Sequence, residues 1–238
     1  MRIYKNCKEA VKEVGRDLFE MGIEVQTYSM QDKVVEGDPD FFTQELSPYM
    51  FMITDPLLDP ESFMQHIFPE DWEGQLKWCY LEIRERTSDS FLNPGTAWEI
   101  RNEVWAEYIH EGTFAYSYND RIRVQLPRII TELRNKPGTR QAIVNIHSNF
   151  RGDIDKLGGG SRVPCSMHYQ FLLRNEKLDL IYVMRSSDYL THFCNDNWLA
   201  IALLGHVCKE TGYKPGNYTF TTGSLHAYHK DLKTRGIF

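Results

Sequence analysis

The chain has 238 residues, of which 42% are hydrophobic and 25% are charged, which suits one sizeable globular domain. Its net charge is −6 and it contains no run of lysine and arginine, so duplex nucleic acid is not an expected partner. The sequence has no signal-peptide pattern and no apolar stretch of about 20 residues, and its five cysteines are widely spaced, so we expect free thiols, no membrane span and a cytoplasmic location.

The N-terminal part begins with a predicted helix. Residues 8–21 carry apolar side chains at helical spacing, and Gly22 is a suitable C-cap. Residues 31–40 predict a loop or a weak strand. The apolar segment 41–52 that follows contains one conspicuous acidic residue, Glu45.

The middle of the chain is more polar. Residues 55–95 are rich in Pro, Asp and Glu, and we expect them to form a variable surface insertion with short helices. A helix is predicted over residues 126–133, and the sequence Asn135-Lys136-Pro137-Gly138 ends it.

Strand patterns dominate the C-terminal half. They cover residues 142–147, 167–173, 178–184 and 218–222. A glycine-rich loop is expected at 151–162, a polar hairpin turn at 174–177, and a helix over 197–211 that ends at Gly212. No linker divides the chain, so we expect residues 1–238 to form one α+β domain around a sheet.

Cys165 is a candidate nucleophile at the start of a predicted strand. A thiolate is the reactive form of cysteine and needs nearby positive charge, which Arg162 and Arg185 would supply. The alternative is a small buried hydrophobic residue, and the local sequence alone favours that alternative.

Two further segments carry candidate ligands. Arg185 is followed by two hydroxyl residues and Asp188, a combination that suits a phosphate monoester but also a solvated end of a strand. His226 and Tyr228 would point to one face of a strand, either as ligands of sugar hydroxyls or as ordinary edge residues.

The joint order of these segments resembles the thymidylate synthase superfamily, and most closely the phage deoxycytidylate hydroxymethylases. The resemblance is strongest between Cys165 and Tyr228, extends weakly to Glu45 and Arg140, and fades between residues 53 and 95. The motifs that carry it are Pro164-Cys165, Tyr169-Gln170-Phe171, Arg185-Ser186-Ser187-Asp188, Thr211-Gly212-Tyr213-Lys214-Pro215-Gly216 and His226-Ala227-Tyr228.

The resemblance implies a thymidylate synthase-like fold, with a mixed sheet flanked by helices and packed against a partner subunit in a homodimer. It also implies methylenetetrahydrofolate as cofactor, a pyrimidine 5′-monophosphate as substrate, and no metal. The implied catalytic residues are Cys165, which adds to C6 of the pyrimidine, and Glu45, which organises water and handles protons.

The remaining implied roles concern binding. The residues expected to bind the substrate are Arg185, Ser186, Arg140, Gln170, His226 and Tyr228. The residues expected to bind the folate are Asp188 and Trp98. Arg140 would reach the phosphate of the neighbouring subunit. Relatives usually have a second arginine after it, where this chain has Gln141, and thymidylate synthases have histidine where this chain has Ser166.

Asp196 is the most informative position, because thymidylate synthases have asparagine there. Uracil presents an N3–H donor and an O4 acceptor, which suit an amide, whereas cytosine presents an N3 acceptor and an N4 donor, which suit a carboxyl group. Asp196 therefore predicts a cytosine reader with a part in catalysis. A one-residue slip would instead place Asn197 at this position and restore uracil.

The function predicted from the resemblance is hydroxymethylation of dCMP at C5. The alternatives are methylation of dUMP or dCMP through the same intermediate, and an inactive relative that binds nucleotide. Retention of Cys165, Glu45, Arg185 and Asp196 argues against the inactive relative.

Overall fold

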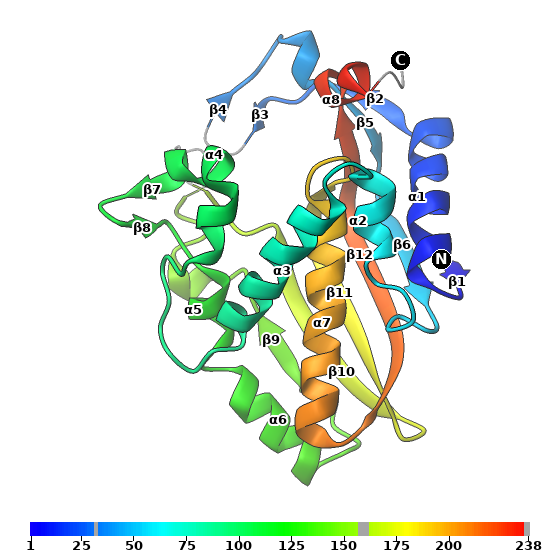
Figure 1. Ribbon diagram of the computed structural model, residues 1–238, viewed down its shortest axis with the longest axis vertical. Coiled ribbons are helices and arrows are strands. Elements are labelled where there is room, and N and C mark those ends of the chain that lie inside the picture. The colour runs from blue at the N-terminus through cyan, green and yellow to red at the C-terminus, as the bar shows by residue number, and fades with distance from the viewer. Residues whose placement is uncertain (31–32, 157–161, 236–238) are drawn as a thin grey trace.

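The protein is described here by a computed structural model that covers residues 1–30, 33–156 and 162–235 (Figure 1). A mixed sheet forms its centre, with the long helix α7 (Phe193–Thr211) running along one face of it. The central glycines of the predicted loop at 151–162 lie outside the described residues.

The main sheet has eight strands. They are β1 (Arg2–Tyr4), β2 (Ile23–Val25), β5 (Thr43–Leu46), β6 (Tyr49–Ile53), β9 (Ile143–Asn145), β10 (Ser166–Arg174), β11 (Lys177–Asp188) and β12 (Lys214–Tyr228). The order is β1-β6-β12-β11-β10-β9, and β5 pairs with both β12 and β2. Two small hairpins lie apart from it, β3 (Ser29–Met30) with β4 (Lys33–Val34) and β7 (Ile109–His110) with β8 (Thr113–Phe114).

The β10–β11 hairpin confirms the predicted turn. The strands pair antiparallel, and the turn residues Asn175 and Glu176 have φ angles of 49° and 63°. A two-residue turn with both residues in the left-handed region matches the twist of the flanking strands. β11 then pairs parallel with β12, which is possible because α7 crosses between them.

The other helices confirm two predictions closely. α1 (Cys7–Met21) ends at Gly22, and its N-cap Asn6 accepts a hydrogen bond from the amide of Glu9. α6 (Leu126–Asn135) matches the helix predicted over 126–133. The remaining helices are α2 (Ser62–Ile67), α3 (Trp72–Arg86), α4 (Asn102–Trp105), α5 (Tyr118–Ile122) and α8 (His229–Thr234), with 3-10 turns η1 (Pro39–Phe41), η2 (Ala97–Arg101), η3 (Ala106–Tyr108) and η4 (Asn149–Arg151).

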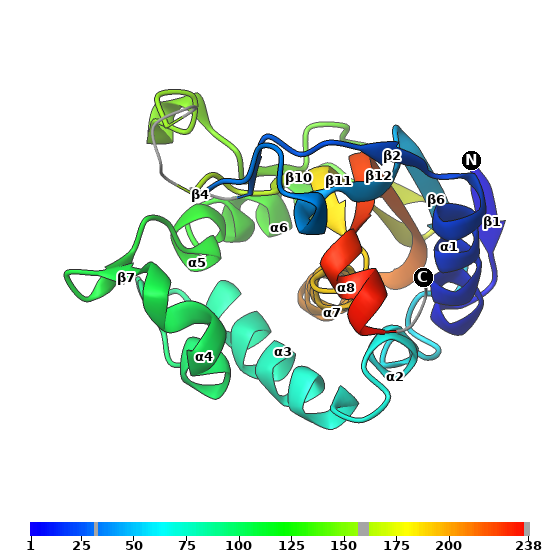
Figure 2. The same ribbon diagram turned by 90° about the horizontal axis from the view of Figure 1, so that it is seen from above.

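The hydrophobic core lies between the sheet and the helices on one of its faces (Figure 2). Phe51 and Phe220 stack with ring centroids 5.2 Å apart, and Phe193 of α7 packs on both rings. Each such fully buried side chain stabilises the fold by about 1.5–3 kcal/mol. The alternate side chains, among them Ile181 and Val183 of β11, point to the opposite face and are only half-buried.

The prediction that residues 55–95 lie on the surface is wrong. Phe63, Met64 and Cys79 are fully buried, and α3 is a 15-residue helix that packs against α7. The composition misleads because α3 also buries two polar residues, Gln75 and Arg86, which obscure its apolar face.

Two boundaries in the C-terminal half also differ from the prediction. α7 begins at Phe193, four residues before the predicted start at Asn197. β12 extends from Lys214 to Tyr228 and so continues through Gly223, where we expected it to end. A Cβ atom at Gly223 would lie 2.9 Å from the carbonyl oxygen of Arg185, so this glycine permits the close pairing of the two strands.

Candidate active site

A cavity of about 560 Å³ opens where the C-terminal ends of β11 and β12 meet the start of α7 and the helix α3. This volume suits a small-molecule ligand. The cavity is lined by nine of the eleven residues with expected roles, Glu45, Trp98, Cys165, Arg185, Ser186, Asp188, Asp196, His226 and Tyr228. The motifs that are dispersed in sequence therefore meet in one place.

Cys165 lies just before β10 and is partly exposed to the cavity. The hydroxyl of Ser186 lies 3.8 Å from its sulfur. The guanidinium of Arg185 donates to the carbonyl oxygens of Pro164 and Val163, both at 3.1 Å, and its backbone amide donates to the carbonyl of Cys165 at 2.8 Å. Arg185 therefore fixes the segment that carries the thiol and places a positive charge beside it.

Three titratable side chains come from neighbouring strands. His226 of β12 pairs in register with Glu45 of β5 on one side and with Asp188 of β11 on the other. Burial lowers the pKa of His226 to about 4, despite the opposing effect of Glu45, and its Nδ1 lies 3.1 Å from the hydroxyl of Ser224. His226 is thus a neutral imidazole at physiological pH, next to Tyr228, whose ring centroid is 5.3 Å away.

Burial also raises the pKa values of two acidic residues of the cavity. It raises the pKa of Asp188 to about 6, although hydrogen bonds from Thr191 and Leu190 act in the opposite direction. It raises the pKa of Asp196 to about 7, against the attraction of the buried cations Arg86 and Arg101. Asp196 therefore carries a proton for a large part of the time at neutral pH and offers both a donor and an acceptor.

Three consecutive polar side chains at the start of α7 have different partners, although Asn195 lines the cavity as well as Asp196. Asp196 faces the cavity. Asn197 is fully buried, donates to the carbonyl of Phe193 at 2.8 Å and accepts from the hydroxyl of Tyr218 at 2.7 Å. The amide of Asn195 donates to Gln75 at 3.3 Å and to the sulfur of Cys79 at 3.4 Å.

Aromatic rings form another wall of the cavity. Trp98 and Trp105 both pack edge to face against Phe114. The guanidinium of Arg162 lies over the rings of Trp105 and Tyr108, at 4.8 and 4.4 Å from their centroids. The indole nitrogen of Trp105 is buried and has no hydrogen-bond partner among the described residues, so this wall offers mainly flat aromatic surface.

Several lining residues have no motif in the sequence. Arg86 and Glu82 of α3 form an ion pair with a 2.7 Å Nε–Oε1 distance, and both line the cavity with Tyr116 and Tyr118. His192 also lines it, and burial, reinforced by nearby Arg101 and Arg162, lowers its pKa to about 3. The sequence gives only a weak indication that these residues line a cavity: they are charged or aromatic, and they lie in segments that are otherwise predicted to be on the surface.

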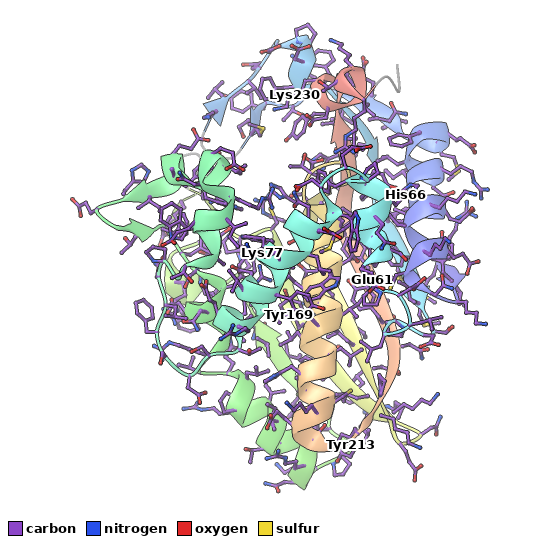
Figure 3. The ribbon with its side chains drawn as sticks, in the orientation of Figure 1. Glu61, His66, Lys77, Tyr169, Tyr213 and Lys230 are labelled. Carbon is purple, nitrogen blue, oxygen red and sulfur yellow. The ribbon has the colours of Figure 1, made fainter. Side chains whose placement is uncertain are left out.

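Arg140 and Gln170 lie away from the cavity. Arg140 is exposed, and the side-chain amide of Gln170 donates to its carbonyl oxygen at 3.0 Å. The expectation that Gln170 contacts substrate is not met within this subunit, because β10 alternates and turns this side chain away from the core face that buries Tyr169. Figure 3 shows Tyr169 in the middle of the molecule. Lys230, which lines the cavity, lies on α8 at the top of the same view.

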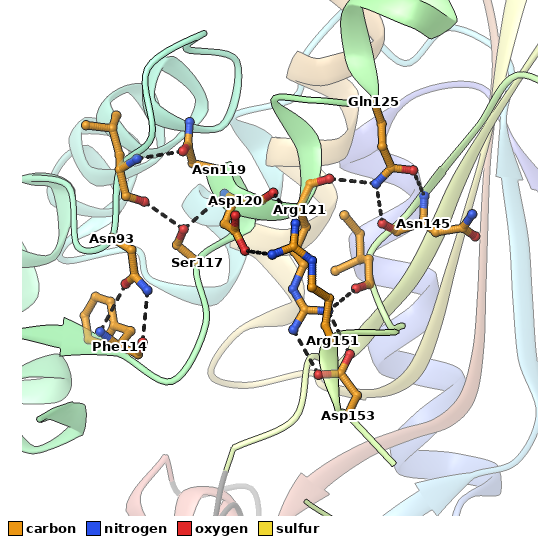
Figure 4. A network of polar contacts seen from close by, with 12 residues as sticks. Asn93, Phe114, Ser117, Asn119, Asp120, Arg121, Gln125, Asn145, Arg151 and Asp153 are labelled. Carbon is orange, nitrogen blue, oxygen red and sulfur yellow. Dashed lines mark hydrogen bonds and ion pairs between the residues drawn. The ribbon is translucent and has the colours of Figure 1, made fainter. Parts of the chain in front are cut away.

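A buried ion pair supports the loop that follows β9. Arg121 of α5 binds both carboxylate oxygens of Asp153, at 2.8 and 2.9 Å, and the carbonyl of Ile146 at 2.8 Å (Figure 4). Burial by itself would raise the pKa of Asp153, but the bonds from Arg121 and Ser148 hold it below its usual value. The pair therefore ties the loop after β9 to the helix that begins with Tyr118.

Neither a metal site nor a membrane span is found in residues 1–30, 33–156 and 162–235. No group of three or more His, Cys, Asp or Glu side chains in these ranges is arranged to hold a metal ion. None of the helices there is both long and apolar enough to cross a bilayer.

Comparisons with known proteins agree on one family. A family model described as thymidylate synthase matches residues 80–235. A putative thymidylate synthase of Methanocaldococcus jannaschii is 32% identical over 126 residues, which are 52% of this chain and 56% of that protein. A putative thymidylate synthase of Methanosarcina barkeri is 30% identical over 147 residues, which are 57% of this chain and 65% of that protein.

The match to these relatives thus spans about 56–65% of their length. A solved structure, thermostable thymidylate synthase A from Bacillus subtilis, superposes with a TM-score of 0.64 at 18% identity. The superposition covers 97% of this chain and 82% of that chain, so the fold is shared over nearly all of the sequence.

Proposed function

The chain belongs to the thymidylate synthase family, and from this premise we propose that it transfers a one-carbon unit to C5 of a pyrimidine nucleoside 5′-monophosphate. We further propose dCMP as the preferred substrate and 5-hydroxymethyl-dCMP as the product. Methylenetetrahydrofolate is the proposed donor.

The preference for cytosine rests on the orientation of Asp196. This side chain faces the cavity with a pKa near 7, whereas both polar atoms of the Asn197 amide are used inside the core. A protonated carboxyl group donates to N3 of cytosine and accepts from its N4 amino group. The same group could instead accept from N3–H and donate to O4 of uracil, so the proposed preference requires that its hydroxyl oxygen faces N3 and its carbonyl oxygen faces the 4-substituent. In that orientation uracil meets a buried mismatch, which is costly.

Cys165 is the proposed nucleophile. Its thiolate adds to C6 of the pyrimidine, and the electron pair of the C5–C6 double bond moves to C5, which then bonds to the one-carbon unit. Arg185 and Ser186 lie beside the sulfur and are the proposed ligands of the 5′-phosphate, because a guanidinium binds a phosphate through charge-assisted hydrogen bonds.

The later steps need proton transfer at C5. Loss of the C5 proton, together with cleavage of the bond between the one-carbon unit and the folate nitrogen, would yield an exocyclic methylene group and release tetrahydrofolate. Water then adds to the methylene group, and the C6–S bond breaks to restore the C5–C6 double bond and free the thiolate. Glu45 is the proposed group that accepts protons from water here. His226 and Tyr228, a neutral imidazole and a phenol side by side, are the proposed ligands of the sugar 3′-hydroxyl.

The folate site is proposed along the aromatic wall. Trp98 and Trp105 offer flat surface for a ring system, and the carboxyl of Asp188 offers hydrogen bonds, so these residues fit a pterin. When bound, methylenetetrahydrofolate supplies the one-carbon unit.

We also propose that the second face of the sheet packs against a partner subunit. Ile181 and Val183 lie on this face, half-buried. Gln170 and the exposed Arg140 lie together at one place on the surface, away from the cavity. In a homodimer Arg140 would reach the phosphate of the neighbouring subunit. Gln170 would hold the backbone of Arg140 in place.

The experiment uses dCMP and dUMP labelled with tritium at C5, each with methylenetetrahydrofolate. Release of tritium from dCMP together with a hydroxymethyl product by mass spectrometry supports the proposal. Release from dUMP with a methyl product would establish thymidylate synthesis, the activity in the names of relatives such as the thymidylate synthase of Mycoplasma genitalium. Release from neither nucleotide would refute one-carbon transfer.

A further inference from the structure

A chain of hydroxyl groups connects the cavity wall to the core directly behind Cys165. The phenol of Tyr118, which lines the cavity, lies 3.1 Å from the hydroxyl of Ser166. The hydroxyl of Ser166 lies 2.6 Å from the phenol of Tyr182. Ser166 and Tyr182 are fully buried.

The local backbone explains why Ser166 points away from the cavity while Cys165 points into it. Adjacent residues of an extended chain face opposite sides. Ser166 pairs with Met184 of β11, and the register then shifts before His168, so a bulge separates Ser166 from the regular part of β10. Such irregularities often re-aim a side chain next to an active site.

The ring of Tyr118 is held from a second direction. The guanidinium carbon of Arg86 lies 3.8 Å from the ring centroid, and Glu82 keeps Arg86 in place through its 2.7 Å ion pair. Arg86 is almost completely buried, so this contact is shielded from water. The hydrogen bond to Ser166 and the stacked Arg86 together define both the position and the orientation of the phenol.

The direction of the hydrogen bonds in this chain has a further consequence. The phenol of Tyr169 also interacts with Tyr182 and Ser166, so four hydroxyl groups meet here and their hydrogen bonds can run in either direction. Burial raises the pKa values of Tyr118 and Tyr182, so both phenols stay neutral. If the bonds run from Tyr182 through Ser166, the hydroxyl of Tyr118 is free to donate into the cavity; if they run in reverse, it is free to accept there.

We propose that Ser166 is a positioning residue that holds the hydroxyl of Tyr118 at the cavity wall and allows it to alternate between donor and acceptor. This inference rests on the proposed function, whose proton transfers at C5 require a group of this kind. No net charge moves, because each reversal only rotates the existing O–H bonds.

The kinetic test compares variants that break the chain with one that does not. Ser166→Ala should lower kcat for tritium release by about 10- to 100-fold with little change in KM, since the phenol is misplaced. Ser166→Thr retains a hydroxyl and should recover most of the loss. The matched control is Tyr49→Phe, which removes another buried phenol, hydrogen-bonded to Asp17 at 2.8 Å and outside both this chain and the cavity, and should leave kcat unchanged.

A double variant distinguishes positioning from a general structural effect. In a Tyr118→Phe background, Ser166→Ala should lower kcat no further, because the hydroxyl that it positions is already absent. Full additivity of the two losses would overturn the inference. So would a Ser166→Ala enzyme with wild-type kcat.

A readout without turnover keeps this inference separate from the proposed function. In protein labelled with 3-fluorotyrosine, the resonance of Tyr118, assigned with Tyr118→Phe, should shift in Ser166→Ala and remain in place in Tyr49→Phe. An unchanged Tyr118 resonance in Ser166→Ala overturns the inference. If the wild type releases no tritium, the proposed function fails, while the fluorine spectrum still decides whether Ser166 positions Tyr118.

Discussion

Replacing Asp196 by asparagine is the most direct test of base recognition. The substitution keeps the size of the side chain but fixes one donor and one acceptor in place of a carboxyl group that gains and loses a proton near neutral pH. With its oxygen toward N3 and its NH2 group toward the 4-substituent, the amide matches uracil and mismatches cytosine, so Asp196→Asn should weaken the use of dCMP and favour dUMP. The cavity places this side chain among buried groups, so mismatched atoms have little water to compensate them.

The size of the effect follows from the two polar positions on the base edge, N3 and the 4-substituent. Each unmatched buried polar atom costs about 1–3 kcal/mol. The two together correspond to about 2–6 kcal/mol, or roughly a 30- to 20,000-fold change in the ratio of kcat/KM for dCMP to that for dUMP.

The assay is tritium release from each nucleotide in competition, with the wild type and the variant measured side by side. The matched control is Asn197→Asp, which places a carboxyl group one residue further along but inside the core. It should lower the melting temperature, because it removes the amide donor to Phe193, and leave the base preference unchanged. An unchanged preference in Asp196→Asn, or a switched preference in Asn197→Asp, would refute the reasoning.

Three further predictions concern the thiol, the pH dependence and the fold. Cys165→Ser should abolish tritium release yet still bind dCMP in calorimetry; residual release at the wild-type rate would exclude Cys165 as the nucleophile. Asp196 is protonated below its pKa of about 7, so kcat/KM for dCMP should be level at lower pH and decline as the pH rises through 7. If Asp196→Asn shows the same decline with dUMP, another group is responsible. Arg121→Met leaves the carboxylate of Asp153 buried without its cation and should lower the free energy of unfolding in urea by about 3–5 kcal/mol, whereas a loss below 1 kcal/mol would contradict a buried pair.

The sequence predicts those elements best whose apolar pattern and end signals agree. α1 and α6 match because apolar side chains recur at helical spacing and a glycine or an Asn-Lys-Pro-Gly segment ends each helix. The same pattern does not predict α3, because its residues Arg86 and Gln75 are polar and nevertheless buried. Their burial depends on partners from other elements, which a local pattern does not contain.

The candidate site shows the same division. The order of the motifs predicted that Cys165, Arg185 and His226 would be found together, and the structure places all three on one cavity. Tyr118 and Arg86 reach that cavity from segments without a motif, through packing alone. The roles assigned to the expected residues stay predictions until they are tested.

The hydrogen bonds on either side of Asp196 have a consequence for how the site can change in evolution. Asn195 is held by α3 and Asn197 by β12, so the helical phase of the first turn of α7 is locked on both flanks. A helix advances about 100° per residue, and an inserted or deleted residue would rotate both amides away from their partners at once. A single substitution at position 196 can therefore change the group that faces the base, whereas an insertion or deletion near it would disrupt the start of α7.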